Sequence, residues 1–281
     1  MNLQDKLENL EQHNQALLAI NFYNYETLKA VVRAIRQCNQ QVILQASEST
    51  VRYLGAKPAA ALARSVLQDE AVEGWLHLDH ASDMDVLERC LEAGFDSVMI
   101  DASQYPLEKN VEITQKAVEK AKYYGASVEA ELGYIAKLGQ SQQKLEFTQP
   151  KQAKTFVEQT QVDCLAVAIG SAHGFYQQQP ELRIDLLEEI HQAVGAHLVL
   201  HGSSGIPDDQ LVKAVGHGIR KINLATEIKD AFMKKLKAVM QHSEELDLRK
   251  VFPRAMDDVQ ALVENKLHVL SGNGGTFSLR G

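Results

Sequence analysis

The sequence predicts an α/β protein that folds as a single (β/α)8 barrel of the TIM type, with a short N-terminal helix and extra C-terminal helices. Two observations predict this fold. Short apolar segments alternate with longer segments of helical period along most of the chain. Eight such apolar segments recur within about 210 residues, and eight parallel strands are the number that closes into a barrel of this kind.

The elements can be justified in chain order. Residues 1 to 13 are polar with helical period, which predicts the N-terminal helix. A helix follows each strand unless a loop intervenes, most clearly at 26–38, at 82–94 behind a Ser or Asp cap, and at 207–218, which starts with proline and ends with glycine. The eight strands are predicted at residues 16–22, 41–45, 74–78, 96–100, 126–132, 164–170, 197–201 and 220–224.

A doubly wound open sheet has the same alternation and is the structural alternative. That fold usually carries a glycine-rich turn after its first strand, whereas this chain has NFYNYE at 21–26. No linker divides the chain, so residues 1–281 are expected to form one domain, with 272–281 as a disordered tail. Residues 133–149 form the one long polar connection, and a loop of that length is usually functional or mobile.

Charge and composition exclude several classes of protein. The net charge of −8 comes without any basic tract, which argues against binding to nucleic acid. No apolar run approaches the ~18 residues of a membrane span, and the N-terminus does not have the pattern of a secretory signal. The three cysteines are odd in number and lack C-x-x-C spacing, which argues against disulfides and thiolate zinc sites and fits a reducing cytoplasm.

Polar side chains collect where the predicted strands end. Chemistry in such barrels lies at the carboxyl ends of the strands, so these residues are candidates for one site. A single strand-end histidine is more often structural, and Asp101 could simply cap the helix that follows it. Several such residues arriving at one rim from different strands favour a functional site: Asp79, His80, Asp101, Glu129, Glu131, His173, His201 and Asn223.

Three of these histidines could bind a metal. Neutral imidazoles are the usual ligands of zinc, and a catalytic zinc keeps three protein ligands with one position open. His80, His173 and His201 could supply them. Because the three are far apart in the chain and form no local zinc motif, the prediction depends on the barrel.

Two glycine-containing segments suggest a phosphate site. SAHGFY (171–176) and LHGSSGIP (200–207) would allow close approach to an anion, and IPDDQ begins a helix whose amide groups could attract phosphate. Barrel phosphate sites commonly lie near strands seven and eight, and Thr226 could complete the cradle. The alternative is a tight turn with a helix cap. A metal ion beside a phosphate pocket indicates a sugar phosphate as substrate.

Ordered sequence blocks carry a family resemblance. NFYNYE, HLDH, SVMIDAS, SVEAELG, LAVAIGSAHG, LVLHGSSG and KINLATE follow one another in this chain. Over roughly residues 3–265 the chain resembles the class II, metal-dependent ketose-bisphosphate aldolases. LAVAIGSAHGFY and NLATEIK are most similar to the tagatose-bisphosphate type.

The resemblance implies a role for each matching residue. His80, His173 and His201 would hold the catalytic zinc, whereas Asp101 and Glu131 would contact the ion in an alternative position or bind a second divalent ion. Asp79 would be the acid/base and Asn223 would orient the enediolate. The phosphate would lie on Gly174, Gly202, Ser204 and Thr226, with Na+ or K+ nearby.

The resemblance also implies contacts outside this centre. Asn21 and Ser47 match substrate-contacting positions near the other rim. Arg249, in Asp247-Leu248-Arg249, would reach the substrate phosphate of a neighbouring subunit, which implies a homodimer or homotetramer.

The implied activity is reversible cleavage of tagatose- or fructose-1,6-bisphosphate to dihydroxyacetone phosphate and glyceraldehyde 3-phosphate through a zinc-stabilised enediolate. One segment departs from the family pattern. The family's GGxED loop glutamate is missing, because no carboxylate lies between Gly133 and Glu146. Glu146, Asp79 or a water could substitute for it. A non-standard sugar phosphate, or a non-catalytic sugar-phosphate-binding subunit working with an accessory aldolase chain, are the alternatives.

Two other barrel enzymes are alternatives. A Schiff-base aldolase needs a desolvated lysine inside the barrel, but strand six has none, and Lys221 is predicted at the start of strand eight, the wrong end. A zinc hydrolase of the amidohydrolase kind expects His-x-His on the first strand, where this chain has Ile20, Asn21 and Phe22.

Overall fold

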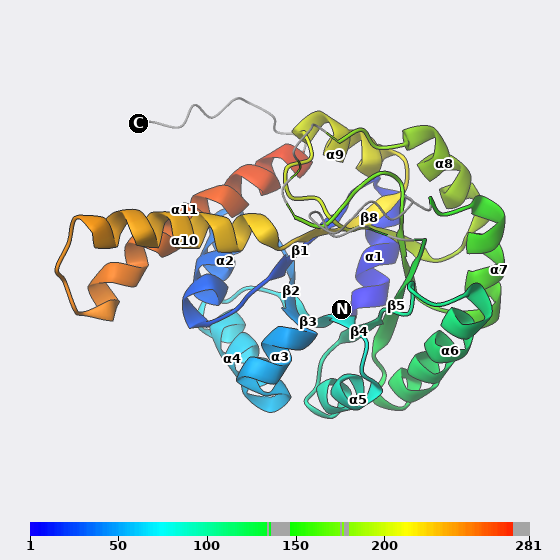
Figure 1. The fold of residues 1–281 in the computed structure, drawn as a ribbon, viewed down its shortest axis with the longest axis horizontal. Helices are drawn as coiled ribbons and strands as arrows, with labels where there is room; N and C mark the ends of the chain where they lie inside the picture. The colour runs from blue at the N-terminus through cyan, green and yellow to red at the C-terminus, as the bar shows by residue number, and fades with distance from the viewer. Residues whose placement is uncertain (134, 136–146, 175, 177–179, 272–281) are drawn as a thin grey trace.

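The computed structural model describes residues 1–133, 135, 147–174, 176 and 180–271. Its parallel strands close into a barrel in which each strand pairs with the next and the eighth pairs with the first (Figure 1). The predicted (β/α)8 barrel is therefore confirmed. The strands are β1 (Leu17–Asn21), β2 (Val42–Ser47), β3 (Gly74–Ala81), β4 (Ser97–Ile100), β5 (Ser127–Leu132), β6 (Cys164–Val167), β7 (His197–Leu200) and β8 (Ile219–Leu224).

Two strands end three residues away from their predicted ends, whereas the bounds of the others differ by at most two residues. β3 continues past residue 78 to Ala81. β6 ends at Val167 rather than at residue 170, because the next backbone groups bond to loops instead of to neighbouring strands. Thr148 N donates to Ala168 O at 3.0 Å, and Arg183 N donates to Ile169 O at 2.9 Å.

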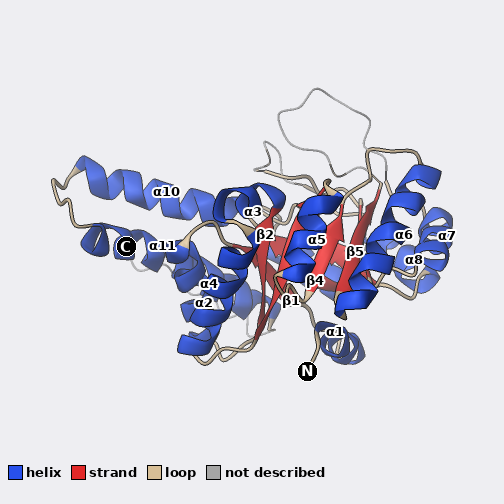
Figure 2. Cartoon of the chain, turned by 90° about the horizontal axis from the view of Figure 1, so that it is seen from below, coloured by secondary structure: helices blue, strands red, loops and turns tan. Residues whose placement is uncertain are grey.

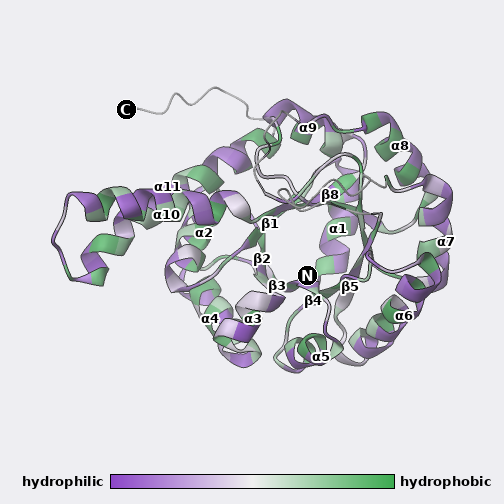
Figure 3. Cartoon of the chain, in the orientation of Figure 1, coloured by the Kyte–Doolittle hydropathy of each residue, from purple (hydrophilic) through white to green (hydrophobic). Residues whose placement is uncertain are grey.

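Helices form a layer around the barrel. Their hydrophobic residues alternate with hydrophilic ones along each helix, as expected for helices with one face on the sheet (Figure 3). The helices of the described residues are α1 (Leu3–Gln12), α2 (Tyr25–Gln37), α3 (Glu48–Leu54), α4 (Ala56–Asp69), α5 (Met84–Glu92), α6 (Leu107–Tyr124), α7 (Pro150–Thr160), α8 (Ile184–Ala193), α9 (Asp208–Gly216), α10 (Thr226–Gln241) and α11 (Leu248–Leu270).

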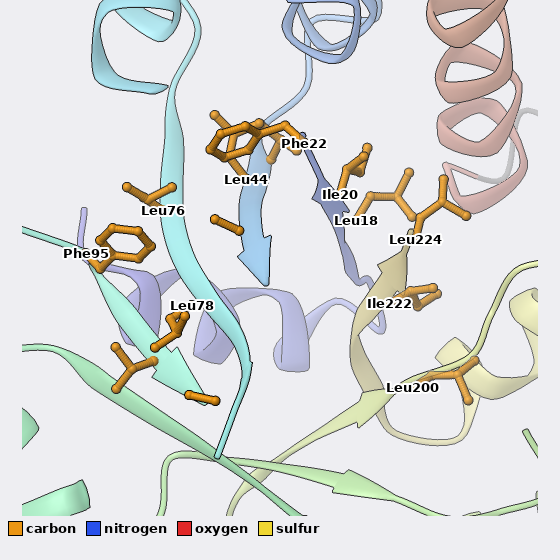
Figure 4. Packing of buried hydrophobic residues seen from close by; sticks show 14 of the residues in the cluster. Leu18, Ile20, Phe22, Leu44, Leu76, Leu78, Phe95, Leu200, Ile222 and Leu224 are labelled. Atoms are coloured by element: carbon orange, nitrogen blue, oxygen red, sulfur yellow. The ribbon is translucent and has the colours of Figure 1, made fainter. Parts of the chain in front are cut away.

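The main core lies between the strands and the helices. Leu18 and Ile20 of β1 belong to it, together with Leu44, Leu76 and Leu78 of the neighbouring strands (Figure 4). The alternate residues of β1 face the barrel interior, because side chains in a strand point to opposite sides in turn. Leu17 and Ala19 belong to a separate apolar cluster inside the barrel, and Asn21 is the next residue in this row.

The predicted N-terminal helix covers one end of the barrel. α1 lies beyond the amino ends of the strands (Figure 2) and buries Leu3, Leu7 and Leu10 against the interior apolar cluster. The predicted extra C-terminal helices are α10 and α11, which form a hairpin that projects to one side of the barrel (Figures 1 and 2). Among the described residues, no helix combines the length and the apolar character needed to cross a membrane. The predicted disordered tail, 272–281, is outside the described residues.

Candidate active site at the carboxyl ends of the strands

A pocket opens where the strands end, at the end of the barrel opposite α1. Most of the residues predicted for the site line it. The lining consists of Asn21, Asp79, His80, His173, Gly174, Gly202, Ser203, Ser204, Asn223, Ala225 and Thr226.

A local irregularity in β3 brings two consecutive residues into this pocket. Neighbouring residues of a regular strand point to opposite sides, so Asp79 and His80 would not both face the barrel interior. The pairing of β3 with β4 shifts register between Leu78 and Ala81, and His80 has φ 49°, in the left-handed region. This bulge turns both side chains to the same pocket, and backbone strain of this kind is typical of functional sites.

Four side chains converge at the base of the pocket. His80, Glu131, His173 and His201 each offer a ligand atom, and these atoms all lie within 4.8 Å of one another. The ring centroid of His80 is 4.9 Å from that of His173 and 4.6 Å from that of His201. The barrel thus brings together the three histidines of the predicted zinc site, together with Glu131.

The buried lone pairs of this cluster fit a metal ion. His80 Nε2, His201 Nδ1 and Glu131 Oε2 are buried, and none has a hydrogen-bond partner among the described residues. His201 Nδ1 lies only 3.5 Å from Glu131 Oε2. Burial lowers the pKa of His201 well below its usual value, which keeps the ring neutral. Three imidazoles and one carboxylate are a donor set that zinc and related divalent ions accept.

Asp101 orients His80 in this structure. Its Oδ2 lies 2.9 Å from His80 Nδ1, so Nδ1 keeps its proton, and Nε2, which faces the cluster, is the nitrogen that would give up its proton to bind a metal ion. Burial acts to lower the pKa of His80, but Asp79 and Asp101 outweigh it and raise the pKa to about 9. Burial, with the charge of Asp101, raises the pKa of Glu131 to about 8. Asp101 is not one of the four clustered residues, and its role as a ligand of a second ion stays a prediction.

Asp79 is held from two sides by amide groups. Asn21 Nδ2 donates to Asp79 Oδ2 at 2.8 Å, and Asn223 Nδ2 donates to Oδ1 at 3.3 Å. Burial acts to raise the pKa of Asp79, whereas His80, His201 and Asn21 lower it, and the net shift is downward. The side chain is therefore a carboxylate ready to accept a proton. The predicted rim for Asn21 was wrong, because it lies at the same rim as Asp79.

The loops after β6, β7 and β8 line the part of the pocket where the sequence predicts a phosphate. Gly202 has φ 65° and contacts Ala172 so closely that a Cβ there would lie 2.4 Å from Ala172 O. The helix at the pocket is α10, not α9 as the sequence suggested: Ala225 and Thr226 line the pocket, whereas no α9 residue does. The N-cap residue of α10, Ala225, makes no side-chain cap, and of the first amide groups Glu227 N donates to Ser204 Oγ at 3.4 Å. Amide groups at the start of a helix can attract an anion.

Two predicted residues belong neither to the pocket lining nor to the metal cluster and its partner Asp101. Ser47 ends β2 opposite Asp79, at the same rim rather than the other one, and its hydroxyl caps α3 by accepting from Thr50 N. Arg249 begins α11 on the projecting hairpin, where its side chain is 90% exposed and paired with Asp247. Glu146, proposed as a substitute for the loop glutamate, is outside the described residues.

Sequence reasoning missed several residues that support the site. Gln45 is fully buried and donates to Asn21 Oδ1 at 2.9 Å, which orients the amide that binds Asp79. Tyr176 OH donates to Gly202 O at 2.8 Å and accepts from Ala172 N, so it ties the two loops together. A glutamine inside an apolar strand was the available signal for Gln45. Tyr176 carried no comparable signal.

Lys221 lies toward the amino end of β8, as predicted, where it is paired with Leu17 of β1. It is the third residue of β8, it faces the barrel interior, and it is 1% exposed. Its Nζ lies 2.6 Å from Glu129 Oε2, in a buried ion pair. A lysine held in this way donates hydrogen bonds and is not a free amine nucleophile, which argues against the Schiff-base alternative.

The fold and the pocket together define a class of protein, a (β/α)8 barrel with a His/Glu cluster able to hold a metal ion beside a cradle suited to an anion. The family model for class II fructose-bisphosphate aldolases matches residues 1–275. The chain belongs to this family. It is a metal-dependent aldolase, a lyase that acts on the carbon–carbon bond of a sugar phosphate.

Individual relatives agree with this assignment. The chain is 35% identical over 282 residues to the fructose-bisphosphate aldolase of Geobacillus stearothermophilus, covering 98% of each chain. It is 35% identical over 275 residues to the probable fructose-bisphosphate aldolase of Bacillus subtilis, covering 95% of this chain and 96% of that protein. Its structure is similar to that of the YdjI aldolase from Escherichia coli K12, with a TM-score of 0.86, 30% identity and coverage of 97% and 98%.

Proposed function

We propose that this chain is a zinc-dependent aldolase that cleaves a ketose 1,6-bisphosphate, tagatose- or fructose-1,6-bisphosphate, to dihydroxyacetone phosphate and glyceraldehyde 3-phosphate. One observation carries the proposal. The ligand atoms of His80, His173, His201 and Glu131 lie within 4.8 Å of one another, and His80 and His173 also line the pocket that contains Asp79 and the glycine-rich loops. Metal, proton acceptor and anion site are thus all within reach of one small substrate.

His80, His173 and His201 would hold the zinc, and Glu131 would hold it in an alternative position. Bound zinc supplies a Lewis acid that polarises the carbonyl and hydroxyl oxygens of the ketose. Gly174, Gly202, Ser204 and Thr226 bind the phosphate next to this centre, at the N-terminus of α10. A monovalent cation, Na+ or K+, would accompany the phosphate.

Asp79 performs the proton transfer. Its carboxylate removes the proton from the C4 hydroxyl while the C3–C4 bond breaks and the electron pair of that bond stays on C3. In the condensation direction the same carboxyl returns the proton to the aldehyde oxygen. Asn21 and Asn223 hold the carboxylate in place, and the amide of Asn223 donates toward oxygen charge that develops beside it.

The test uses Asp79→Asn, which keeps the size of the side chain and removes its ability to take a proton. We expect turnover of the two bisphosphates to fall by a factor of about 10² to 10⁴, with the zinc content unchanged. Asp185→Asn, at an exposed carboxylate, is the control and should keep wild-type turnover. A chelator should abolish wild-type activity and added zinc should restore it.

The missing loop glutamate favours a second candidate, a sugar-phosphate-binding subunit that acts with an accessory aldolase chain. It would retain zinc and bind both bisphosphates without releasing triose phosphate. That result with the wild-type protein would replace the enzyme proposal with the subunit proposal. Wild-type turnover by Asp79→Asn would contradict the assignment of Asp79 as the acid/base.

The assembly and compartment belong to the same proposal. The exposed Arg249 at the start of α11 supports a homodimer or homotetramer in which it reaches a neighbour's substrate phosphate. The three cysteines are free thiols, which fits the reducing cytoplasm.

A further inference from the structure

A polar layer lies inside the barrel, directly below the candidate metal site. Its members come from β3, β4, β5 and β8 and from the residue that follows β7, and each is at most 3% exposed. The interior of such a barrel is usually filled with branched apolar side chains, so this layer is unusual. It consists of His77, Ser97, Glu129, Lys221 and His201.

These side chains form one continuous chain of hydrogen bonds. Ser97 Oγ lies 2.7 Å from His77 Nδ1, and His77 Nε2 lies 3.2 Å from Lys221 Nζ. Lys221 Nζ lies 2.6 Å from Glu129 Oε2, and Glu129 Oε1 lies 2.7 Å from His201 Nε2. The last member, His201, is one of the four residues in the metal cluster.

The chemistry of the donors fixes the direction of each bond. An ammonium group only donates and an ionised carboxylate only accepts. Glu129 therefore accepts from Lys221 through Oε2 and from His201 Nε2 through Oε1. The ring proton of His201 is then on Nε2, and the lone pair is on Nδ1. That Nδ1 is the atom that faces Glu131 at 3.5 Å.

Stability alone does not explain the ion pair. A buried pair such as Lys221–Glu129 contributes little net stability compared with apolar residues of similar size, because both charges lose their hydration. Its contact with His201 gives it a positional function, since the partner of the second ring nitrogen determines which nitrogen of a histidine can bind a metal.

We propose that Glu129 and Lys221 are positioning residues: Glu129 holds the proton of His201 on Nε2, and Lys221 holds Glu129 in the orientation that does so. The proposal rests on the proposed function only in taking His201 as a metal ligand. Neither residue touches the substrate pocket, since neither is part of its lining.

The substitution Glu129→Gln separates this role from simple packing. Lys221 can only donate, so it binds the amide oxygen of the new glutamine and leaves the amide NH2 facing His201. That NH2 donates to Nε2, and the proton of His201 moves to Nδ1, where it blocks the metal-binding lone pair. We expect zinc affinity to fall about 10- to 100-fold.

A second substitution gives a rescue. In Glu129→Gln with Lys221→Met, the amide is free to rotate and can present its oxygen to His201. Zinc affinity should then recover relative to Glu129→Gln alone, whereas a purely structural role would make the double variant worse. Glu70→Gln, which removes a buried carboxylate paired with Lys29 on the outside of the barrel, is the matched control and should leave zinc affinity unchanged.

Two measurements test the positioning role of Glu129 and Lys221. Competition with a chromophoric chelator gives zinc affinity for each variant, after circular dichroism has shown that it is folded. Long-range 1H–15N spectra of the metal-free, histidine-labelled protein show which nitrogen of His201 carries the proton, with His201→Gln for assignment. An Nδ1–H ring in the wild type, or wild-type zinc affinity in Glu129→Gln, would overturn the proposal. Neither measurement depends on turnover. If the protein had no aldolase activity, the proposed function would be wrong, but the positioning role of Glu129 and Lys221 could still be confirmed.

Discussion

At the scale of single residues, backbone conformation decides which side chains reach the pocket. His80 adopts φ 49°, which lets it share the pocket with Asp79. Gly202 adopts φ 65°, at the point where the loops after β6 and β7 touch. His80 therefore carries the strain of a side chain in the left-handed region. Gly202 has no room for a side chain, because Ala172 lies too close.

Gly202→Ala tests the close approach of the two loops. A left-handed backbone costs a non-glycine residue about 1 to 2 kcal/mol, and the new Cβ would also meet Ala172 O at 2.4 Å. We expect the free energy of unfolding to fall by about 3 kcal/mol in total, with weaker binding of inorganic phosphate. Urea unfolding and calorimetric titration measure the two effects.

Gly94→Ala is the matched control for this substitution. Gly94 also has a positive φ, 84°, but nothing lies within 4 Å of the position that a Cβ would take there. Only the backbone cost of about 1 kcal/mol should remain. Equal losses of stability in the two variants would show that the contact with Ala172 carries no cost.

At the scale of elements, α1 closes the amino end of the barrel. Leu3, Leu7 and Leu10 pack on the interior residues of the first strands, including Leu17 and Trp75. Arg220 of β8 binds Glu11 of α1 at 2.8 Å, which holds the helix in place. The opposite end stays polar because the interior rows of the strands change from apolar residues to amide, carboxylate and imidazole side chains.

Leu7→Ala tests how much α1 contributes to stability. Leu7 is fully buried, so its truncation removes apolar contacts and leaves a cavity, at a cost of about 3 kcal/mol. Leu246→Ala, at a residue that is 91% exposed, should leave the free energy of unfolding nearly unchanged. Urea denaturation compares the two variants. A loss below about 0.5 kcal/mol for Leu7→Ala would mean that α1 is not part of the cooperative core.

At the scale of the whole molecule, ion pairs between the outer helices make stability depend on pH. Glu70, which follows α4, binds Lys29 at 2.7 Å and Arg36 at 2.7 Å, both on α2. The hydrogen bond from Lys29 is the largest cause of a pKa of Glu70 below its ordinary value of 4.5. A carboxyl group with a lowered pKa stabilises the fold above its unfolded pKa, and this contribution is lost as the pH falls through the folded pKa.

Glu70→Gln should therefore reduce the free energy of unfolding by about 1 to 2 kcal/mol at neutral pH. The difference from wild type should shrink as the pH falls below 4.5. Urea unfolding at a series of pH values measures it. Glu112→Gln, which removes exposed pairs on α6, should have a smaller effect that salt suppresses. A Glu70→Gln difference that stays constant into acid would contradict the assignment.

Much of the architecture was predictable because it depends on local pattern. All eight strands appear where short apolar segments predicted them, and the helices at 26–38, 82–94 and 207–218 were found within a few residues. The strand-end rule also selected Asp79, His80, His173 and His201, which line one pocket or share one cluster. The end of β6 was missed because loop residues, rather than its own composition, take its last hydrogen bonds.

By itself, the sequence determined the barrel, its polar rim and the family, because strand and helix periods, residue types and ordered blocks are all local properties of the chain. Only the tertiary structure decided which polar groups meet. Gln45 orients Asn21, Glu129 binds both Lys221 and His201, and α10 rather than α9 lies at the pocket. The physical reason is that these contacts depend on strand register, on the β3 bulge and on closure of the barrel. The hydrophobic period along the chain predicts which face of an element a side chain occupies, but it does not predict which residue lies opposite that side chain.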